Sequence, residues 1–207
     1  MNLSWLPNLI SVVRILLIPP TLYAIAIGAY PVALALFFFA GFSDGVDGFL
    51  AKRFAWQSRL GALLDPAADK LLVAGVFLTL AAVGLVPVWL AAVVIVRDLV
   101  IVAGALAYNF FIAPVTGQPT KLSKVNTAIE LLYVLSVLGH AGFAWPPDIT
   151  LLVLGAGVFV TAVVSGMDYV LSWARRARET ARETAREAAR EMARKRARET
   201  ASKENRA

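Results

Sequence analysis

Four aspartates in the first third of the chain have the spacing of a site for a hard cation. Asp44 and Asp47 lie three residues apart, and Asp65 and Asp69 lie four residues apart. Residues at these spacings share one face of an α-helix, so each pair presents its two carboxylates together. The segment between the pairs is short enough to fold two helices back on each other. We therefore expect all four carboxylates to converge at one depth.

Carboxylates that converge in this way repel one another unless protons or cations lie among them. The chain has no cysteine and a single histidine, which excludes thiolate chemistry and disfavours a histidine-based metal site. A ligand set made only of oxygen atoms suits one or two Mg²⁺ or Mn²⁺ ions. A calcium EF-hand loop is rejected because no acidic residue stands at its closing position.

The residues around these aspartates suit a substrate that carries a diphosphate. Three glycines leave room beside the acids for a ligand: Gly45, Gly48 and Gly61. Three basic residues place positive charge where a diphosphate would require it: Lys52, Arg53 and Arg59. Metal ions, a base and cations together can displace a group at phosphorus. A second interpretation, a cluster of charges that caps helices at a membrane interface, stays open.

Six apolar runs surround and follow these motifs, and each is long enough, at about 20 residues, to cross a bilayer. They are Leu9–Ile27, Val32–Leu50, Ala67–Leu85, Pro87–Phe111, Val125–Phe143 and Thr150–Leu171. The chain is 59% hydrophobic, against roughly 45–50% in soluble domains. Backbone groups in lipid must be satisfied within their own segment, so each run is predicted to be helical. The predicted fold class is an all-α integral membrane protein with six transmembrane helices.

Basic residues indicate how these helices are oriented. Lysines and arginines follow the second, fourth and sixth runs, whereas the other loops carry none. Because basic loops stay on the cytoplasmic side, both termini and the aspartates are predicted to face the cytoplasm. The first run has no basic residue before it and no evident cleavage site, so we interpret it as a retained helix. A bacterial inner membrane is the expected location.

The last 34 residues differ in composition from the rest of the chain. Residues 174–207 hold twelve Lys or Arg and six Glu, whereas residues 1–173 are formally neutral. Tetrads of Ala-Arg-Glu-Thr favour a helix but offer almost no apolar residue to a core. We predict a solvated, charged helical or disordered tail, and attraction to anionic headgroups is a second interpretation.

The segment from Asp44 to Asp69 resembles the signature of the CDP-alcohol phosphatidyltransferases, D-x2-D-G-x2-A-R-x8-G-x3-D-x3-D. Every spacing matches. Lys52 stands at the arginine of the signature, with Arg53 next to it, and lysine lacks arginine's bidentate contact to phosphate. The pattern of apolar runs extends the resemblance over residues 7–171, which predicts a membrane domain at 1–173 and a tail at 174–207.

This resemblance implies transfer of a phosphatidyl group from CDP-diacylglycerol to an alcohol, with release of CMP. It implies that Asp44, Asp47, Asp65 and Asp69 hold two divalent ions, and that Asp69 is the general base for the acceptor hydroxyl. Relatives carry Asn-x2-Thr-x2-Arg where this chain has Asn8, Ser11 and Arg14; Arg14 contacts the nucleotide or forms a buried structural pair. The CDP-binding set is Asn8, Ser11, Arg14, Asp44, Gly48, Ala51, Lys52 and Gly61. Relatives are homodimers, so a homodimer is expected by analogy.

The stretch from Lys121 to Thr127 bears on the acceptor. Relatives that use glycerol 3-phosphate resemble Gly-Lys-x-Lys-Thr, and Asn126 stands here at the second lysine. Leu-Ser-Lys-Val-Asn-Thr-Ala is instead similar to cardiolipin synthases of the same fold, which use phosphatidylglycerol. A phosphodiester carries less charge than a phosphate monoester and requires fewer cations. We favour phosphatidylglycerol over glycerol 3-phosphate and assign five residues to the acceptor: Arg53, Arg97, Lys121, Lys124 and Asn126.

Two other classes of function remain as alternatives. An ion-coupled transporter is the first, because intramembrane aspartates also mark ion paths. The four aspartates lie at one face of the membrane rather than along a path, which favours the enzyme. A structural scaffold is the second, and it predicts no effect of divalent ions on stability. The expected partners are the bilayer and the two lipid substrates, with no nucleic acid.

Overall fold

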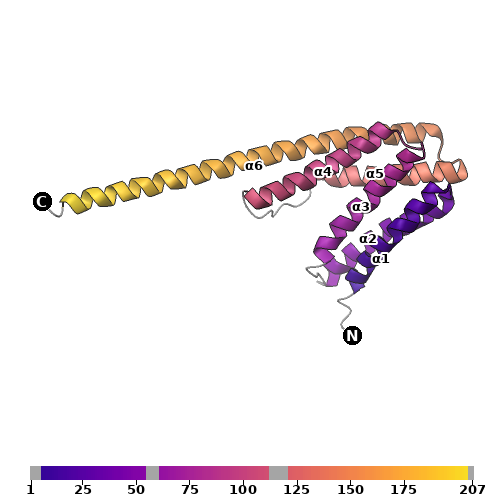
Figure 1. Cartoon of the computed structure of the whole chain (residues 1–207), viewed down its shortest axis with the longest axis horizontal. Helices are drawn as coiled ribbons and strands as arrows, with labels where there is room; N and C mark the ends of the chain where they lie inside the picture. Colours follow the sequence, from indigo (N-terminus) through magenta and orange to yellow (C-terminus); the bar gives the residue numbers. More distant parts are fainter. Residues whose placement is uncertain (1–5, 55–60, 112–120, 205–207) are drawn as a thin grey trace. The chain divides into compact units, whose positions relative to one another are not determined.

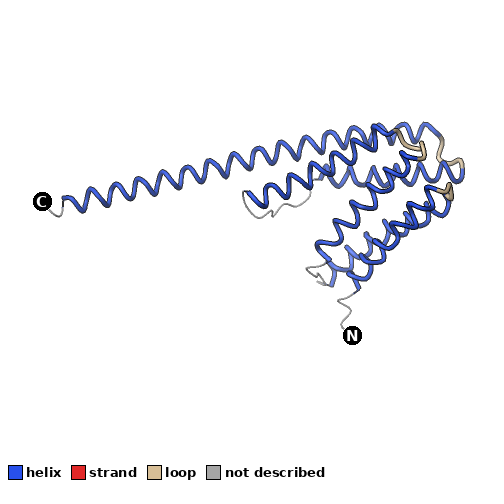
Figure 2. The backbone as a smooth tube through the Cα atoms, viewed as in Figure 1, coloured by secondary structure: helices blue, strands red, loops and turns tan. Residues whose placement is uncertain are grey.

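The computed structural model describes the backbone of residues 6–54, 61–111 and 121–204 (Figure 1). Side chains are described over residues 12–43, 69–104 and 122–172, and at five positions of the tail. Within the described backbone, all regular structure is α-helical (Figure 2). The helices are α1 (Leu6–Ala26), α2 (Tyr30–Phe54), α3 (Gly61–Ala82), α4 (Val88–Phe111), α5 (Lys121–Phe143) and α6 (Asp148–Glu204). The prediction of an all-α protein is confirmed for these residues.

Two helices are long and apolar enough to cross a membrane over their described residues, Leu122–Phe143 and Asp148–Ser172. Shorter apolar stretches occupy Val12–Ala26 and Tyr30–Ser43. Each predicted run lies largely within one helix, but α6 continues through most of the tail to Glu204. The tail is therefore helical over its described backbone, which fits its content of alanine, arginine and glutamate. Six complete spans and the orientation of the termini stay predictions.

The chain divides into two compact units. The first comprises Met1–Leu99 with Pro119–Ser165, and the second comprises Val100–Gln118 with Gly166–Ala207. The first unit holds α1, α2, α3 and α5, together with the first parts of α4 and α6. All contacts described below for the candidate site lie within this first unit.

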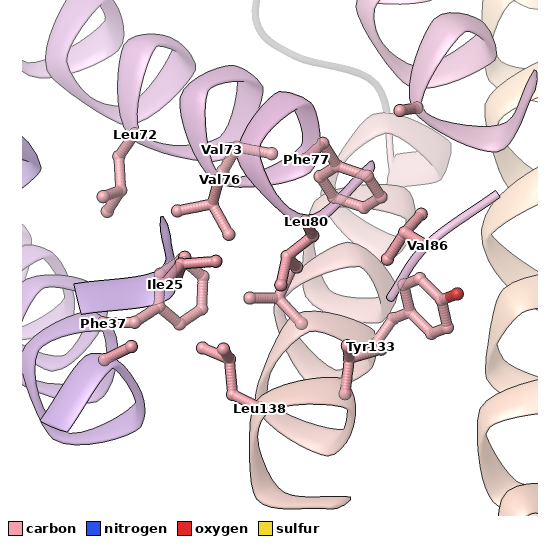
Figure 3. Close-up of a cluster of buried hydrophobic side chains, with 14 of the residues drawn as sticks. Ile25, Phe37, Leu72, Val73, Val76, Phe77, Leu80, Val86, Tyr133 and Leu138 are labelled. Carbon is pink, nitrogen blue, oxygen red and sulfur yellow. The ribbon is translucent and has the colours of Figure 1, made fainter. Parts of the chain in front are cut away.

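The core of the first unit is made of aliphatic and aromatic side chains from α1, α2, α3 and α5 and from the first parts of α4 and α6 (Figure 3). Ile25, Phe37 and Phe77 are at most 1% exposed, and the ring of Phe77 stacks on that of Tyr133. Other large apolar side chains of the same helices face outward, among them Phe39 and Leu78. A helix that is apolar on its outer face as well as its inner face is typical of a bilayer environment.

Two glycines end α1 and α3 by the same device. Gly28 and Gly84 both have a φ of 78°, a conformation that glycine adopts without strain. The amide after each glycine bonds to a carbonyl five residues back, at 2.9 Å in both turns. This Schellman arrangement satisfies carbonyl groups that the helix ends would leave open. The short turn at Gly28 sends α2 back along α1, against which it packs.

Gly142, near the end of α5, lies close to Pro31 at the start of α2. A Cβ at this position would lie 3.2 Å from the ring and backbone nitrogen of Pro31. We expect Gly142→Ala to lower the free energy of unfolding by about 1–3 kcal/mol, the usual cost of overpacking. Thermal unfolding in detergent measures the change.

Gly41→Ala is the matched control for this prediction. Gly41 lies inside α2, and a Cβ there would meet nothing within 4 Å. Alanine is the better helix former, so this variant is expected to be neutral or slightly stabilising. Equal unfolding temperatures for the two variants would contradict the close approach of Pro31 to α5.

Candidate active site

The backbone brings the two aspartate-bearing segments to one end of the first unit. Asp44 and Asp47 lie in the last three turns of α2, and Asp65 and Asp69 lie in the first three turns of α3. α1 packs against both helices. Figure 1 shows the start of α1, the end of α2 and the start of α3 together at this end. The aspartate pairs therefore lie at a common end, on consecutive helices that both pack against α1.

Asp69 is the member of the four whose side chain the structure describes, and it is half-buried. Most of the other predicted residues at this end fall outside the described side chains. These are Asn8, Ser11, Asp44, Asp47, Gly48, Ala51, Lys52, Arg53, Arg59, Gly61, Asp65 and Lys121. Their assigned roles stay predictions that rest on the signature.

Arg14 is the largest fully buried side chain in the described part of the chain. It lies on α1 and is 0% exposed, among helices made almost entirely of apolar residues. Burying a guanidinium away from water is costly unless charge or hydrogen bonds compensate it. Its position on α1 places it two turns from the helix start, on the side of the molecule where the aspartate segments lie.

Arg97 is the buried centre of a polar group that we call the Arg97 cluster: Lys70, Arg97, Asp98, Ser123 and Ser165. Its Nη1 donates to Asp98 Oδ1 at 2.5 Å, and its Nη2 donates to Ser123 Oγ at 2.9 Å and Ser165 Oγ at 2.8 Å. Lys70 forms an ion pair with the same oxygen of Asp98. One guanidinium on α4 thus connects α5 and α6, and Asp98 connects α4 to α3.

A second polar group, the Asn126 cluster, lies one turn farther along α5. Asn126 is 0% exposed; its Nδ2 donates to Glu130 Oε1 at 2.5 Å, and its Oδ1 accepts from Thr161 Oγ1 at 2.9 Å. Glu130 is 1% exposed. Both polar atoms of the Asn126 amide are therefore used by protein partners, and Asn126 holds a buried carboxylate in place.

The two clusters bring together Arg97 and Asn126, which the sequence assigned to the acceptor. Arg97 bonds to Ser123, which precedes Asn126 by one helical turn on α5. Lys124, the neighbour of Ser123, is exposed. Sequence reasoning did not single out Lys70, Ser123, Glu130, Thr161 or Ser165. Lys70 and Glu130 could have been found, because ionisable residues inside apolar runs usually have a function.

His140, the single histidine of the chain, lies near the end of α5. His140 Nε2 lies 3.1 Å from Asp148 Oδ1, and its Nδ1 lies 2.7 Å from the carbonyl oxygen of Pro146. These contacts connect the end of α5 to the start of α6. They lie at the end of α5 opposite to Asn126.

Divalent ions fit the donor chemistry of the aspartate segments. The two helices supply four carboxylates, an oxygen-only set that Mg²⁺ and Mn²⁺ accept. Among the side chains that the structure describes, no group of three His, Cys, Asp or Glu gathers in one place. Three of the four aspartates lie outside those side chains, so the proposed ligand set is judged on residue type and backbone position alone.

A sequence model of the family described as CDP-alcohol phosphatidyltransferase matches residues 4–175. The chain belongs to this family. The matched range contains all four aspartates and ends at the start of the charged tail. The family predicted from the segment between Asp44 and Asp69 is confirmed.

Individual relatives carry two kinds of name. A rat protein named cardiolipin synthase (CMP-forming) is 35% identical over 180 residues, and its human counterpart of the same name is 34% identical over 180 residues. Each alignment covers 79% of this chain and 60% of the relative, so the chain spans less than two thirds of their length. A Mycobacterium tuberculosis protein named probable phosphatidylglycerophosphate synthase is 29% identical over 172 residues, which are 80% of this chain and 79% of that protein.

Proposed function

We propose that this family member transfers a phosphatidyl group from CDP-diacylglycerol to phosphatidylglycerol, which forms cardiolipin and CMP. The family match over residues 4–175 carries the reaction class. The two relatives named cardiolipin synthase, at 35% and 34% identity, support the acceptor. The sequence Leu-Ser-Lys-Val-Asn-Thr-Ala on α5 supports the same acceptor, because a lysine of glycerol-phosphate-using relatives is absent from it.

In the proposed reaction, Asp69 accepts the proton of the acceptor hydroxyl. The hydroxyl oxygen forms a bond to the phosphorus of the phosphatidyl group, and the bond from that phosphorus to the CMP oxygen breaks. Divalent ions, held by Asp44, Asp47, Asp65 and Asp69, would supply positive charge to the diphosphate. The half-buried position of Asp69 suits a base that must reach both a polar headgroup and the bundle interior.

In this proposal, residues around the start of α1 and the end of α2 bind CDP. Arg14 supplies a buried positive charge, and Ser11 and Asn8 precede it by about one and two turns on α1. Gly48, Ala51 and Gly61 leave space for the cytidine. Lys52 takes the place of the arginine in the signature and contributes charge without a bidentate contact.

Arg97 is the best-placed residue to bind the acceptor's phosphate. Its Nε is buried and has no hydrogen-bond partner among the described residues, whereas its other contacts hold the guanidinium rigidly. A buried donor without a partner is costly, so a bound phosphate oxygen would stabilise it. Arg53, Lys121 and Lys124 add positive charge around this acceptor site.

The proposal places the enzyme in a membrane with six transmembrane helices, both termini in the cytoplasm, and the active site open to the cytoplasmic leaflet. The apolar helices and the basic loops support this topology. A bacterial inner membrane and a homodimer complete the proposal. Attachment of an environment-sensitive label to single cysteines introduced at each loop tests the orientation, because the natural chain has no cysteine.

A single assay tests the function and the acceptor. The purified chain is reconstituted into phosphatidylcholine vesicles with CDP-diacylglycerol and Mg²⁺, and CMP release is measured with phosphatidylglycerol or glycerol 3-phosphate. We expect release that depends on phosphatidylglycerol. Release with glycerol 3-phosphate alone would favour a phosphatidylglycerophosphate synthase, the second candidate, which the 29% identical mycobacterial relative supports. No release with any alcohol would remove the enzyme interpretation and favour a transporter.

Removal of divalent ions is expected to abolish this CMP release. Chelation with EDTA should lower the rate by at least about a hundredfold, because the diphosphate and four carboxylates would then repel one another. Addition of excess Mg²⁺ or Mn²⁺ should restore the rate. Titration with each ion shows which one supports CMP release at the lower concentration. A rate that EDTA leaves unchanged would contradict the assignment of the aspartates as metal ligands.

A further inference from the structure

Glu130 is a buried carboxylate to which the proposed reaction assigns no role. It lies on α5, inside an apolar stretch, and is 1% exposed. Such a group is costly in a membrane helix, so a specific use is the first hypothesis to consider. Asn126, four residues earlier on the same face, donates to it at 2.5 Å and is itself held by Thr161 of α6. The carboxylate is thus fixed in the interior of the bundle.

The Asn126 cluster lies directly next to the Arg97 cluster along two helices. Ser123 and Asn126 are one turn apart on α5, and Ser165 and Thr161 are one turn apart on α6. At one level of the bundle, Arg97 binds Ser123 of α5 and Ser165 of α6. One turn along both helices, Asn126 of α5 binds Thr161 of α6. Glu130 lies one turn beyond Asn126 on α5, and therefore two turns from Ser123, the residue on α5 that binds Arg97.

With Glu130 ionised, the formal charges of the two clusters cancel. Arg97 and the partly exposed Lys70 contribute two positive charges, and Asp98 and Glu130 contribute two negative charges. A neutral interior attracts a phosphate less strongly than a basic one does. This loss of attraction is larger for a phosphate monoester, which carries two negative charges, than for a phosphodiester, which carries one, because Coulomb energy scales with charge.

We propose that Glu130 is a specificity-determining residue that disfavours phosphate monoesters and so selects a phosphodiester acceptor. This inference rests on the proposed function. The buried carboxylate offsets the positive charge of Arg97 where the acceptor's phosphate binds. Asn126 positions that carboxylate and adds no charge of its own. The preference for a phosphodiester acceptor therefore comes from Glu130, which lies outside the signature, and from the absence of a lysine at position 126.

The test compares two acceptors in Glu130→Gln. Glutamine keeps an oxygen that can accept the hydrogen bond of Asn126, so the change removes charge and preserves shape. The readout is kcat/KM for glycerol 3-phosphate divided by kcat/KM for phosphatidylglycerol, in vesicles with CDP-diacylglycerol and Mg²⁺. At an effective dielectric constant of about 20 and a separation of roughly 10 Å, we expect the ratio to rise about tenfold.

Two further variants separate charge from structure. Glu130→Asp keeps the charge and should retain the wild-type ratio. Asn126→Lys replaces the hydrogen-bond donor of Glu130 with a cation that offsets its negative charge, so the ratio should rise here too, even if Glu130→Gln does not fold. Asp148→Asn is the control, because Asp148 has a 91% exposed side chain and lies at the opposite end of α5, and its ratio should not change.

The outcomes distinguish this inference from the proposed function. A ratio that is unchanged in active Glu130→Gln and Asn126→Lys, with both acceptors affected equally, would show that Glu130 is only structural and overturn the inference. Wild-type protein that releases no CMP with phosphatidylglycerol would instead remove the proposed function. An increased ratio in both variants, with the wild-type ratio in Glu130→Asp, is the result that we expect.

Discussion

Asp69→Asn is expected to lower phosphatidylglycerol-dependent CMP release by at least about 10³-fold while leaving the fold intact. General-base catalysis typically contributes 10²–10⁴-fold, and this carboxylate is also a proposed metal ligand, so the expected loss lies in the upper part of that range. Asparagine has nearly the same shape but neither accepts the hydroxyl proton nor carries the charge that a divalent ion requires. Single-turnover CMP release in vesicles measures the change.

Asp148→Asn provides a matched control for this first prediction. The Asp148 side chain is 91% exposed and pairs with His140 at 3.1 Å, at the start of α6. Its replacement should change the rate by less than about twofold, as surface substitutions usually do. Both variants should unfold at the wild-type temperature. Asp69→Asn activity within tenfold of the wild type would exclude Asp69 as the base.

Arg97→Met is expected to lower the free energy of unfolding by about 3–5 kcal/mol, the usual effect of removing one member of a buried ion pair. The guanidinium side chain is 3% exposed and donates to Asp98, Ser123 and Ser165. Methionine fills similar space but leaves two hydroxyl groups without this donor and leaves Asp98 with Lys70 alone. Thermal unfolding of the detergent-solubilised protein measures the loss.

Arg97→Lys separates the charge of this residue from its geometry. Lysine keeps the positive charge, but its single ammonium lacks the planar fork that reaches three oxygens on three helices. We expect an intermediate loss, about 1–3 kcal/mol, together with weaker binding of the acceptor. Arg178→Met in the exposed tail is the control and should leave stability within about 0.5 kcal/mol of the wild type. Similar stability of Arg97→Met and Arg178→Met would contradict a structural role for the Arg97 cluster.

The charged tail shows what composition can determine without a core. Alanine, arginine and glutamate favour a helix locally, and α6 is helical to Glu204. Arg175 and Arg178 are exposed, in agreement with a solvated helix. Whether this helix binds anionic headgroups depends on lipids, which act from outside the chain.

Local chemistry in the sequence was sufficient to predict the helical class, the family and the aspartate segments. Apolar runs of about 20 residues specify helices because lipid leaves backbone groups no other partner. The signature from Asp44 to Asp69 specifies the family because its residues lie on two helices consecutive in the chain, so their spacing is visible in the sequence. The short segment between them also predicted that the end of α2 and the start of α3 lie at one end of the unit, where both helices pack against α1.

Only the tertiary structure decided which polar residues meet across distant helices. Arg97 reaches Ser123 and Ser165, and Asn126 reaches Thr161, over separations of 26, 68 and 35 residues. No period or motif encodes such contacts, because they depend on the rotation of each helix about its axis, which packing sets. The sequence thus identified the four aspartates and the reaction class, whereas packing of α4, α5 and α6 placed Glu130 two turns along α5 from the partner of Arg97 and suggested how the acceptor is chosen.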